Sequence, residues 1–169
     1  MTIKIIAALS SNYVIGDEGK IPWFINGELK RFRQITINHN VVMGRKTFDS
    51  IGKILDQRNN IIISNNQTLK IDNATVVSSF DDAINACDPE QDIFIIGGSK
   101  IYDIALAYSQ YLLLTLIDKE FKGDTFFPKF DQSNWKLIEE NKKYDDINKF
   151  SYSYLTYKAQ WITLGVDNT

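Results

Sequence analysis

The chain has little of the chemistry that builds disulfides or metal sites, with one cysteine and one histidine in 169 residues. A single cysteine cannot form an internal disulfide and fits a reducing compartment, so we expect a cytoplasmic location. Zinc-type sites draw on several histidine and cysteine ligands, so no metal is expected. We predict that Cys87, which ends an apolar-periodic stretch, lies in the core, and that His39 is a surface residue in the polar turn 38–40.

The sequence also lacks a long hydrophobic run and an excess of charge of either sign. Apolar runs such as 112–114 are far shorter than the ~20 residues of a membrane-spanning helix. Segment 3–9 is too short for a signal core and is interrupted by Lys4. With 19 basic and 21 acidic residues the formal net charge is -2, which argues against a nucleic-acid surface. We expect neither a membrane nor a nucleic acid as a partner.

What the sequence does contain is an alternation of apolar strand-like runs and helical patterns. Strands are expected at 3–9, 41–43, 60–64, 75–77, 93–96, 111–117 and 152–157, and helices at 26–36, 45–51, 80–87 and 99–107. This alternation predicts a single α/β domain over residues 1–160, with a central, mostly parallel sheet flanked by about four helices. Strand signals without helices in the last third predict an antiparallel C-terminal edge. We expect the tail, 161–169, to be disordered past the last strand.

An acidic residue falls on the apolar face of the first expected helix. At about 100° per residue, Glu28 shares this face with Phe32 and Ile35, Leu29 lies at its edge, and Asn26 is the expected N-cap. Two interpretations are open. An acid in a first helical turn interacts favourably with the helix dipole, by about 0.3–1 kcal/mol. Alternatively the carboxyl group handles a proton, because burial disfavours its charged form.

Two strand-to-helix turns have features of phosphate sites. In the first, a buried strand runs into Gly44 and then into Arg45 and Lys46, two cations that are unfavourable at a helix N-terminus unless an anion binds there. In the second, a buried strand runs into Gly97 and Gly98, whose missing side chains let a phosphate approach the backbone. Solvated basic side chains and a tight structural turn are the respective alternatives. Because strand C-termini line the crevice of an open sheet, both turns can face one dinucleotide.

Eight short motifs, taken in order and at their spacing, closely resemble the dihydrofolate reductase family from about residue 3 to residue 158. They are Ile6-Ala7-Ala8-Leu9, Val14-Ile15-Gly16, Ile21-Pro22-Trp23, Glu28-Leu29 followed by Phe32, Met43-Gly44-Arg45-Lys46-Thr47-Phe48, Ser50-Ile51-Gly52, Ile96-Gly97-Gly98, and Gly123-Asp124-Thr125 with Phe127-Pro128. The resemblance implies a monomer that reduces 7,8-dihydrofolate to tetrahydrofolate with NADPH, supplies one-carbon metabolism and binds antifolate inhibitors.

The same resemblance implies a role for each matching residue. Glu28 is the active-site acid, which holds the pterin with help from Thr115 and promotes protonation of N5 through water; Trp23 is the third residue assigned to the catalytic site. Substrate contacts are implied for Ile6, Ala8, Glu28, Phe32, Lys53, Leu55, Arg58, Ile96 and Thr115, with Arg58 on the α-carboxylate. Cofactor contacts are implied for Ala8, Val14, Ile15, Gly16, Asp17, Glu18, Gly19, Lys20, Gly44, Arg45, Lys46, Thr47, Ser64, Asn65, Ser78, Gly97, Gly98, Ser99, Lys100, Ile101, Tyr102 and Ile104. The loop 16–24 is implied to be a mobile lid.

The chain departs from the family pattern at several positions. Many bacterial members have aspartate where Glu28 stands; glutamate resembles the vertebrate type and some plasmid-borne types, so weak inhibition by trimethoprim is expected. Lys53 replaces a commoner arginine, segment 54–58 lacks a proline-glycine pair, and segment 24–27 lacks a proline. Two other functions are considered: a pyrimidine reductase of riboflavin synthesis on the same architecture, and a non-catalytic NADPH-binding module. Neither accounts for an acid on an apolar face.

Overall fold

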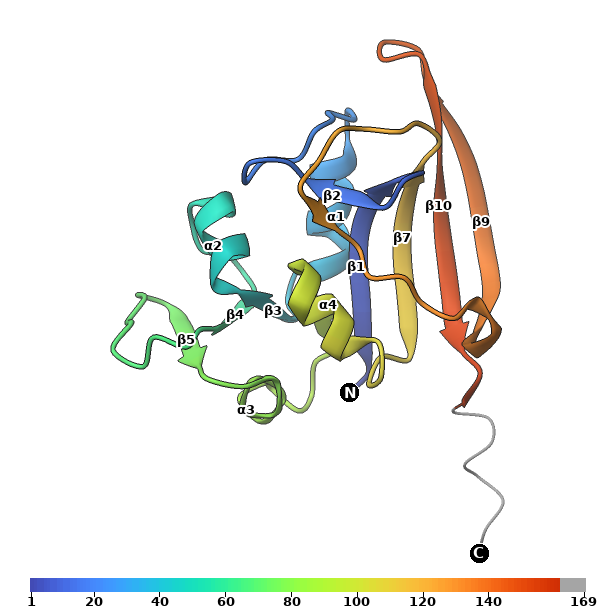
Figure 1. Cartoon of the computed structure of the whole chain (residues 1–169). Helices are drawn as coiled ribbons and strands as arrows, with labels where there is room; N and C mark the ends of the chain where they lie inside the picture. The colour runs from blue at the N-terminus through green and yellow to red at the C-terminus, as the bar shows by residue number, and fades with distance from the viewer. Residues whose placement is uncertain (162–169) are drawn as a thin grey trace, which may run out of the picture.

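A large β-sheet organises the chain, which a computed structural model describes from residue 1 to residue 161. The strands are β1 (Ile3–Ser10), β2 (Val14–Gly16), β3 (Asn40–Gly44), β4 (Asn59–Ile63), β5 (Ala74–Val77), β6 (Ile93–Ile95), β7 (Tyr111–Ile117), β8 (Thr125–Phe126), β9 (Trp135–Asp145) and β10 (Phe150–Ala159). The helices are α1 (Glu28–Thr36), α2 (Arg45–Ile51), α3 (Phe80–Asn85) and α4 (Ser99–Ala105), with a short 3-10 turn, η1 (Gln132–Asn134). Eight strands form the main sheet in the order β5-β4-β3-β6-β1-β7-β10-β9 (Figure 1).

The sheet is parallel except at its C-terminal edge. Strand β1 pairs in parallel with β6 and β7, and β3 pairs in parallel with β4 and β6. Val41, Val42 and Met43 of β3 are completely buried, which is typical of parallel strands that are covered on both faces. Strand β10 is antiparallel to β7 and to β9. The predicted α/β domain, with a mostly parallel sheet, an antiparallel C-terminal edge and four flanking helices, is confirmed.

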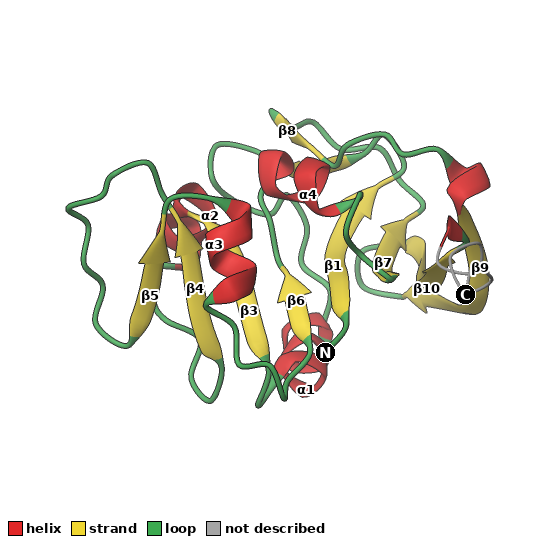
Figure 2. Ribbon diagram, turned by 90° about the horizontal axis from the view of Figure 1, so that it is seen from below, coloured by secondary structure: helices red, strands yellow, loops and turns green. Residues whose placement is uncertain are grey.

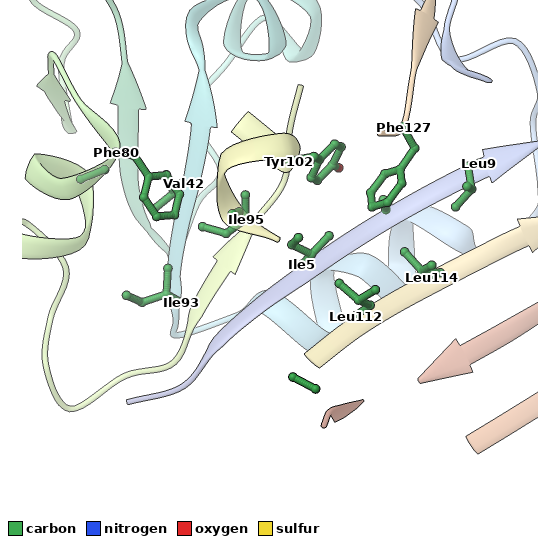
Figure 3. Close-up of a cluster of buried hydrophobic side chains, with 14 of the residues drawn as sticks. Ile5, Leu9, Val42, Phe80, Ile93, Ile95, Tyr102, Leu112, Leu114 and Phe127 are labelled. Carbon is green, nitrogen blue, oxygen red and sulfur yellow. The ribbon is translucent and has the colours of Figure 1, made fainter. Parts of the chain in front are cut away.

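Helices α3 and α4 cover one face of the sheet. Phe80 of α3 and Tyr102 of α4 belong, with Ile5 and Leu112 of the central strands, to the largest cluster of buried side chains, in which Phe80 lies beside Val42 (Figure 3). Full burial of a side chain of this size contributes about 1.5–3 kcal/mol. Cys87 belongs to the same cluster, where burial raises the pKa of its thiol to about 12. Its predicted core position is confirmed.

Helix α1 lies on the opposite face, as Figure 2 shows for α1 and α4. Phe32 and Ile35 of α1 and Phe48 of α2 pack there against a second cluster that includes Ile6 and Met43. Because successive side chains of a strand point to opposite faces, Ile5 and Ile6 serve the two clusters separately. The face of the sheet that α1 covers therefore carries the predicted active-site acid.

The start of α1 corrects one prediction. The helix begins at Glu28, its N-cap is Gly27 with φ of 84°, and the cap makes no side-chain hydrogen bond. Glycine adopts this left-handed conformation readily, so the turn is made by Gly27 rather than capped by Asn26. Leu29, expected at the edge of the apolar face, is 71% exposed.

A second correction concerns His39. The residue does follow the end of α1 in a turn, but its ring is half-buried and contacts Phe94 edge-on, with 5.5 Å between ring centroids. Aromatic packing against a buried strand outweighs the polar neighbours Asn38 and Asn40 that suggested a surface position. Nδ1 of His39 is buried without a hydrogen-bond partner in the described residues.

The sequence patterns did not predict the two short strands β2 and β8. Strands β2 and β8 form a separate two-stranded antiparallel sheet, which lies beside one end of β1 in Figure 1. Two or three residues are too few to show an alternation, and β8 lies within a segment that reads as a loop. The tail predicted for 161–169 begins with the exposed Trp161, and its remainder lies outside the described residues.

Candidate active site

The Glu28 carboxylate is held against the sheet by hydroxyl groups. The Thr115 hydroxyl of β7 donates to Glu28 Oε1 at 2.6 Å, and the Tyr154 hydroxyl of β10 donates to Oε2 at 3.2 Å. Thr115 is 2% exposed, so this end of the helix faces the sheet rather than solvent. Glu28 is also the acidic residue of the first turn of α1, so the dipole contribution remains. The two hydrogen bonds show that the carboxylate interacts with specific side chains of the sheet in addition to the helix dipole.

The side chains beside this acid come from one row across three strands. Ala8 of β1 is the register partner of Thr115 in β7, and Thr115 is the register partner of Tyr154 in β10. Ala8 is half-buried and has the smallest side chain of the three. The row therefore puts the smallest of the three side chains on β1, beside the strand whose Thr115 holds the carboxylate.

Apolar predicted substrate residues gather close to this row. Ile6, Ile96, Phe32 and Leu55 all belong to the cluster on the α1 face of the sheet, although they come from β1, the end of β6, α1 and the segment before β4. Lys53 is exposed in that last segment and makes no hydrogen bond or ion pair among the described residues. The structure thus brings the apolar members of the predicted substrate set together and leaves the lysine apart.

Arg58 is held by a small polar network near Phe32. Its guanidinium group donates to Thr36 Oγ1 at 3.1 Å and to the Asp56 carbonyl at 3.0 Å, and its carbon lies 5.9 Å from the centre of the Phe32 ring. The side chain is 4% exposed, and desolvation lowers the pKa of Arg58, which nevertheless stays charged. Asp56 bridges Arg58 and Arg33, at 3.3 and 2.7 Å. The carboxylate of Asp56 therefore offsets part of the positive charge of Arg33 and Arg58.

The predicted lid, 16–24, is fastened by three distant elements. Asp124 Oδ2 accepts from the Glu18 N–H at 3.0 Å, and the Ser50 hydroxyl of α2 donates to the Gly19 carbonyl. Asn148, in the turn between β9 and β10, donates to the Phe24 carbonyl at 2.8 Å.

Trp23, at the end of the lid, packs on Phe121 with ring centroids 5.2 Å apart. It belongs to a third cluster with Ile25, Ile117 and Phe150. The hydrogen bonds of the Glu28 carboxylate come from Thr115 and Tyr154 rather than from this indole.

The two glycine turns lie directly against each other. The Gly44 N–H donates to the Gly97 carbonyl at 2.8 Å, so the turns that follow β3 and β6 touch at one edge of the sheet, where strand C-termini line a ligand crevice. The peptide bond between Gly97 and Gly98 is cis. The N-caps of α2 and α4 make no side-chain hydrogen bond, and neither helix has an acidic residue in its first turn. Free N–H groups at both helix starts suit an anion.

Next to these turns lies a hollow of about 380 Å³ at the ends of β4 and β5. Its lining is Ser64, Asn66, Gln67, Val76, Val77, Ser78 and Asp82. Ser64 and Ser78 belong to the predicted cofactor set; the others do not. Gly44, the residue before Arg45, is the register partner of Ile63, the residue before Ser64, so Arg45 and Ser64 leave neighbouring strands at the same edge.

The remaining predicted cofactor residues differ in what they can offer a ligand. Val14 is completely buried, so its side chain is not accessible. Tyr102 is nearly so, and its hydroxyl donates to the Ile6 carbonyl at 2.9 Å. Half-buried members are Ile15, Gly16, Asp17, Thr47, Gly98, Ser99 and Ile101, and exposed members are Glu18, Gly19, Lys20, Lys46, Asn65, Lys100 and Ile104.

Within residues 1–161, no group of three or more His, Cys, Asp or Glu side chains is arranged to hold a metal ion. In the same part of the chain, no helix has the length and apolar character that crossing a membrane requires.

Comparison with known sequences decides the family. A family profile described as "Dihydrofolate reductase" matches residues 2–159, which is most of the chain. The chain belongs to the dihydrofolate reductase family. The dihydrofolate reductase of Bacillus subtilis (strain 168) is 39% identical over 159 residues, which cover 94% of this chain and 95% of that protein. "Dihydrofolate reductase type 3" of Salmonella typhimurium is 36% identical over 161 residues, 95% of this chain and 99% of that protein.

A solved dihydrofolate reductase has the same fold. The structure described as dihydrofolate reductase from Enterococcus faecalis, complexed with NADP(H) and RAB-propyl, superposes with a TM-score of 0.87 at 31% identity. The match covers 94% of this chain and 96% of the other. The family expected from the motifs is confirmed, and the chain is an enzyme of the dihydrofolate reductase class. This decides against the riboflavin-pathway reductase and the non-catalytic module.

Several residues of this dihydrofolate reductase site had no predicted role. Asp124 was visible in the motif Gly123-Asp124-Thr125, but no local pattern says that it meets the lid. Tyr154 stands in an expected strand, yet only the register of β7 and β10 brings it to Glu28. Asp56 was visible as an acid beside Arg58, and its pairing with Arg33 depends on the position of α1.

Proposed function

We propose that this chain reduces 7,8-dihydrofolate to tetrahydrofolate with NADPH, and that it does so as a cytoplasmic monomer. The observation that carries the proposal is the Thr115–Glu28 hydrogen bond beside Ala8. It fixes an acid beside the small side chain of Ala8 on β1, while the apolar residues around Ile6 and Phe32 form a wall for a flat ring. A carboxylate so held can accept two parallel N–H donors from a pterin.

The residues present fit a dinucleotide cofactor. A Cβ at Gly98 would lie 3.3 Å from Thr47 Oγ1, and one at Gly97 would lie 3.1 Å from the Tyr102 ring, so the backbone of this turn stays bare only with glycine. Pyrophosphate oxygens can then approach the N–H groups at the start of α4 and α2, with Lys46 and Thr47 beside them. Arg45 and the hollow lined by Ser64 and Ser78 are suited to the adenosine end.

The chain's own groups provide position and proton handling. When bound, NADPH supplies the hydride for C6 of the pterin. Glu28 holds the pterin N3 and 2-amino group and promotes proton transfer to N5 through water, and Thr115 fixes the orientation of its carboxylate. The lid excludes bulk water when it stays fastened to Asp124 and Ser50. Arg58 offers its guanidinium fork to the α-carboxylate of the glutamate tail.

The test is a turnover assay with the purified chain, NADPH and dihydrofolate, in which the loss of NADPH absorbance is followed. We expect turnover with dihydrofolate, little turnover when NADH replaces NADPH, and none with the pyrimidine substrate of riboflavin synthesis. The matched control is Glu28→Gln, which keeps the fold and removes the acid. Failure of the wild-type chain to oxidise NADPH in the presence of dihydrofolate would contradict the proposal.

Weak inhibition by trimethoprim is the finer part of this proposal. It rests on the glutamate at position 28, whose carboxylate reaches one methylene farther than that of aspartate. The fixed contacts with Thr115 and Tyr154 leave this carboxylate little freedom to move back.

A further inference from the structure

A tyrosine on the C-terminal strand pair completes the hydrogen bonding of the active-site acid. Each oxygen of the Glu28 carboxylate accepts one hydroxyl: Oε1 from Thr115 at 2.6 Å and Oε2 from Tyr154 at 3.2 Å. The two donors are register partners on β7 and β10, so the antiparallel edge of the sheet sets their spacing. The carboxylate is therefore held at both oxygens by groups that substrate does not supply.

The ring of Tyr154 is itself fixed in place. The guanidinium carbon of Arg31 lies 3.7 Å from the ring centroid, well within cation–π range. Arg31 is three residues after Glu28 on α1, so acid and cation face β10 from the same side of the helix. On the strand itself, the ring of Tyr152 packs edge-on at 5.6 Å. The hydroxyl of Tyr154 thus points at Glu28 from a ring with neighbours on two sides.

The Tyr154 hydroxyl keeps its proton and acts as a donor. Desolvation, followed by the nearby charge of Glu28 and then by Tyr152, raises the pKa of Tyr154, against a smaller opposing effect of Arg31. Among the charged and titratable groups around it, α1 contributes Glu28 and Arg31 and β10 contributes Tyr152. On β9 the register partner of Tyr152 is Lys143, while β1 and β7 contribute uncharged groups to the row.

We propose that Tyr154 is a positioning residue that sets the pH range in which Glu28 works. A hydrogen bond donated to a carboxylate favours its charged form, so removal of the Tyr154 hydroxyl should favour the protonated form of Glu28. The inference rests on the proposed function, because it assigns this control to the acid of dihydrofolate reduction.

The experiment compares two tyrosine-to-phenylalanine variants in the full chain. Tyr154→Phe removes the hydroxyl at Glu28, and Tyr152→Phe, the matched control, removes a hydroxyl two residues away on the same strand. We expect Tyr154→Phe to raise the midpoint of the pH–rate profile for dihydrofolate reduction by about half a pH unit to one unit. Tyr152→Phe should move it by less than about a third of that. An unchanged or lowered midpoint in Tyr154→Phe would overturn the inference.

A second readout separates this inference from the proposed function. NMR titration of ¹³C-labelled glutamate carboxyl groups follows the Glu28 signal, which Glu28→Gln identifies by its disappearance. Tyr154→Phe should shift this titration midpoint upward by the same amount whether or not the chain turns over dihydrofolate. If Tyr154 had only a structural role, the variant would lower the unfolding temperature and leave both midpoints in place, which would also overturn the proposal.

Discussion

Asp124 and Glu18 are 106 positions apart in the sequence, and the carboxylate of Asp124 accepts the backbone N–H of Glu18 at 3.0 Å. The Asp124 N–H donates to the Gly16 carbonyl at 3.1 Å, and the Thr125 hydroxyl donates to Asp124 Oδ1 at 2.8 Å. One aspartate therefore holds the first residues of the lid, Gly16 and Glu18, to the loop before β8. Whether Asp124 holds the lid in this conformation can be tested by substitution.

Replacing Asp124 with asparagine should loosen the lid, because a neutral amide accepts the Glu18 N–H more weakly. The Glu18 N–H, followed by the Thr125 hydroxyl, lowers the pKa of Asp124, so the charged contact persists through neutral pH and is lost only below the ordinary aspartate pKa of about 3.9. Hydrogen–deuterium exchange at residues 17–20 should be faster in Asp124→Asn at pH 7. Asp103→Asn, which removes an exposed charge on α4, should leave it unchanged. Equal protection in both variants would contradict the fastening role.

Replacing Glu28 with glutamine should lower turnover at neutral pH at least tenfold. Glutamine keeps the shape and can still accept the Thr115 hydroxyl, but it has no titrating proton, and positioned acid–base groups supply ~10²–10⁴ in rate. NADPH binding, measured by fluorescence titration, should hardly change. Near wild-type turnover would mean that Glu28 is only a helix-dipole partner.

Arg45→Ala should weaken NADPH binding roughly tenfold more than NADH binding. This is the low end of the free-energy range for a charged hydrogen bond, and we expect it because the Arg45 side chain is partly exposed. In the structure Arg45 Nε contacts Asp49 Oδ1 at 2.8 Å within α2. Asp49→Asn is the matched variant: it frees the guanidinium group and should strengthen NADPH binding slightly. Dissociation constants for both cofactors check this, and equal losses in Arg45→Ala would show that Arg45 does not bind the 2′-phosphate.

Trimethoprim should inhibit the wild-type chain about a hundredfold more weakly than it inhibits the Glu28→Asp variant. This corresponds to a difference of about 3 kcal/mol in binding free energy. The longer glutamate shifts a rigid diaminopyrimidine relative to the apolar walls at Leu55 and Ile96, which pack in one cluster, and to the exposed Ile21 on the lid. Methotrexate, which can also reach Arg58, should remain tight on both. Inhibition constants for the two compounds on the same preparations test this. Low-nanomolar trimethoprim binding by the wild-type chain would refute it.

Gly123→Ala should lower the free energy of unfolding by about 1–3 kcal/mol. An added Cβ would lie 2.2 Å from Val14 Cγ1 and 2.7 Å from the Gly16 carbonyl, so β2 must move. Gly16→Ala is the comparison, because its Cβ would have only ordinary contacts, at 3.6 Å or more. Urea titration of both variants measures the difference, and equal stability losses would mean that β2 yields without cost.

Local patterns in the sequence were sufficient for the elements and the family. Continuous apolar runs such as 111–117 predicted the buried strands, since burial on both faces leaves no alternation, and β7 has these bounds. Gly44 and Gly97-Gly98 predicted phosphate-type turns because a residue without a side chain leaves the backbone accessible to a phosphate, and this can be seen from the local sequence alone. The eight motifs, taken together in order and at their spacing, then predicted the family, which the comparisons confirmed.

Only the tertiary structure decided which distant groups meet. The Glu28 hydrogen bonds span 87 and 126 positions, and they follow from the register of β1, β7 and β10 rather than from any local pattern. Short elements were equally hidden: β2 and β8 are too short to have a period, and they exist because they pair with each other. The start of α1 was decided by the backbone of Gly27. Sequence periodicity reports the side of an element that is buried, whereas contacts between elements depend on how the whole sheet brings their ends together.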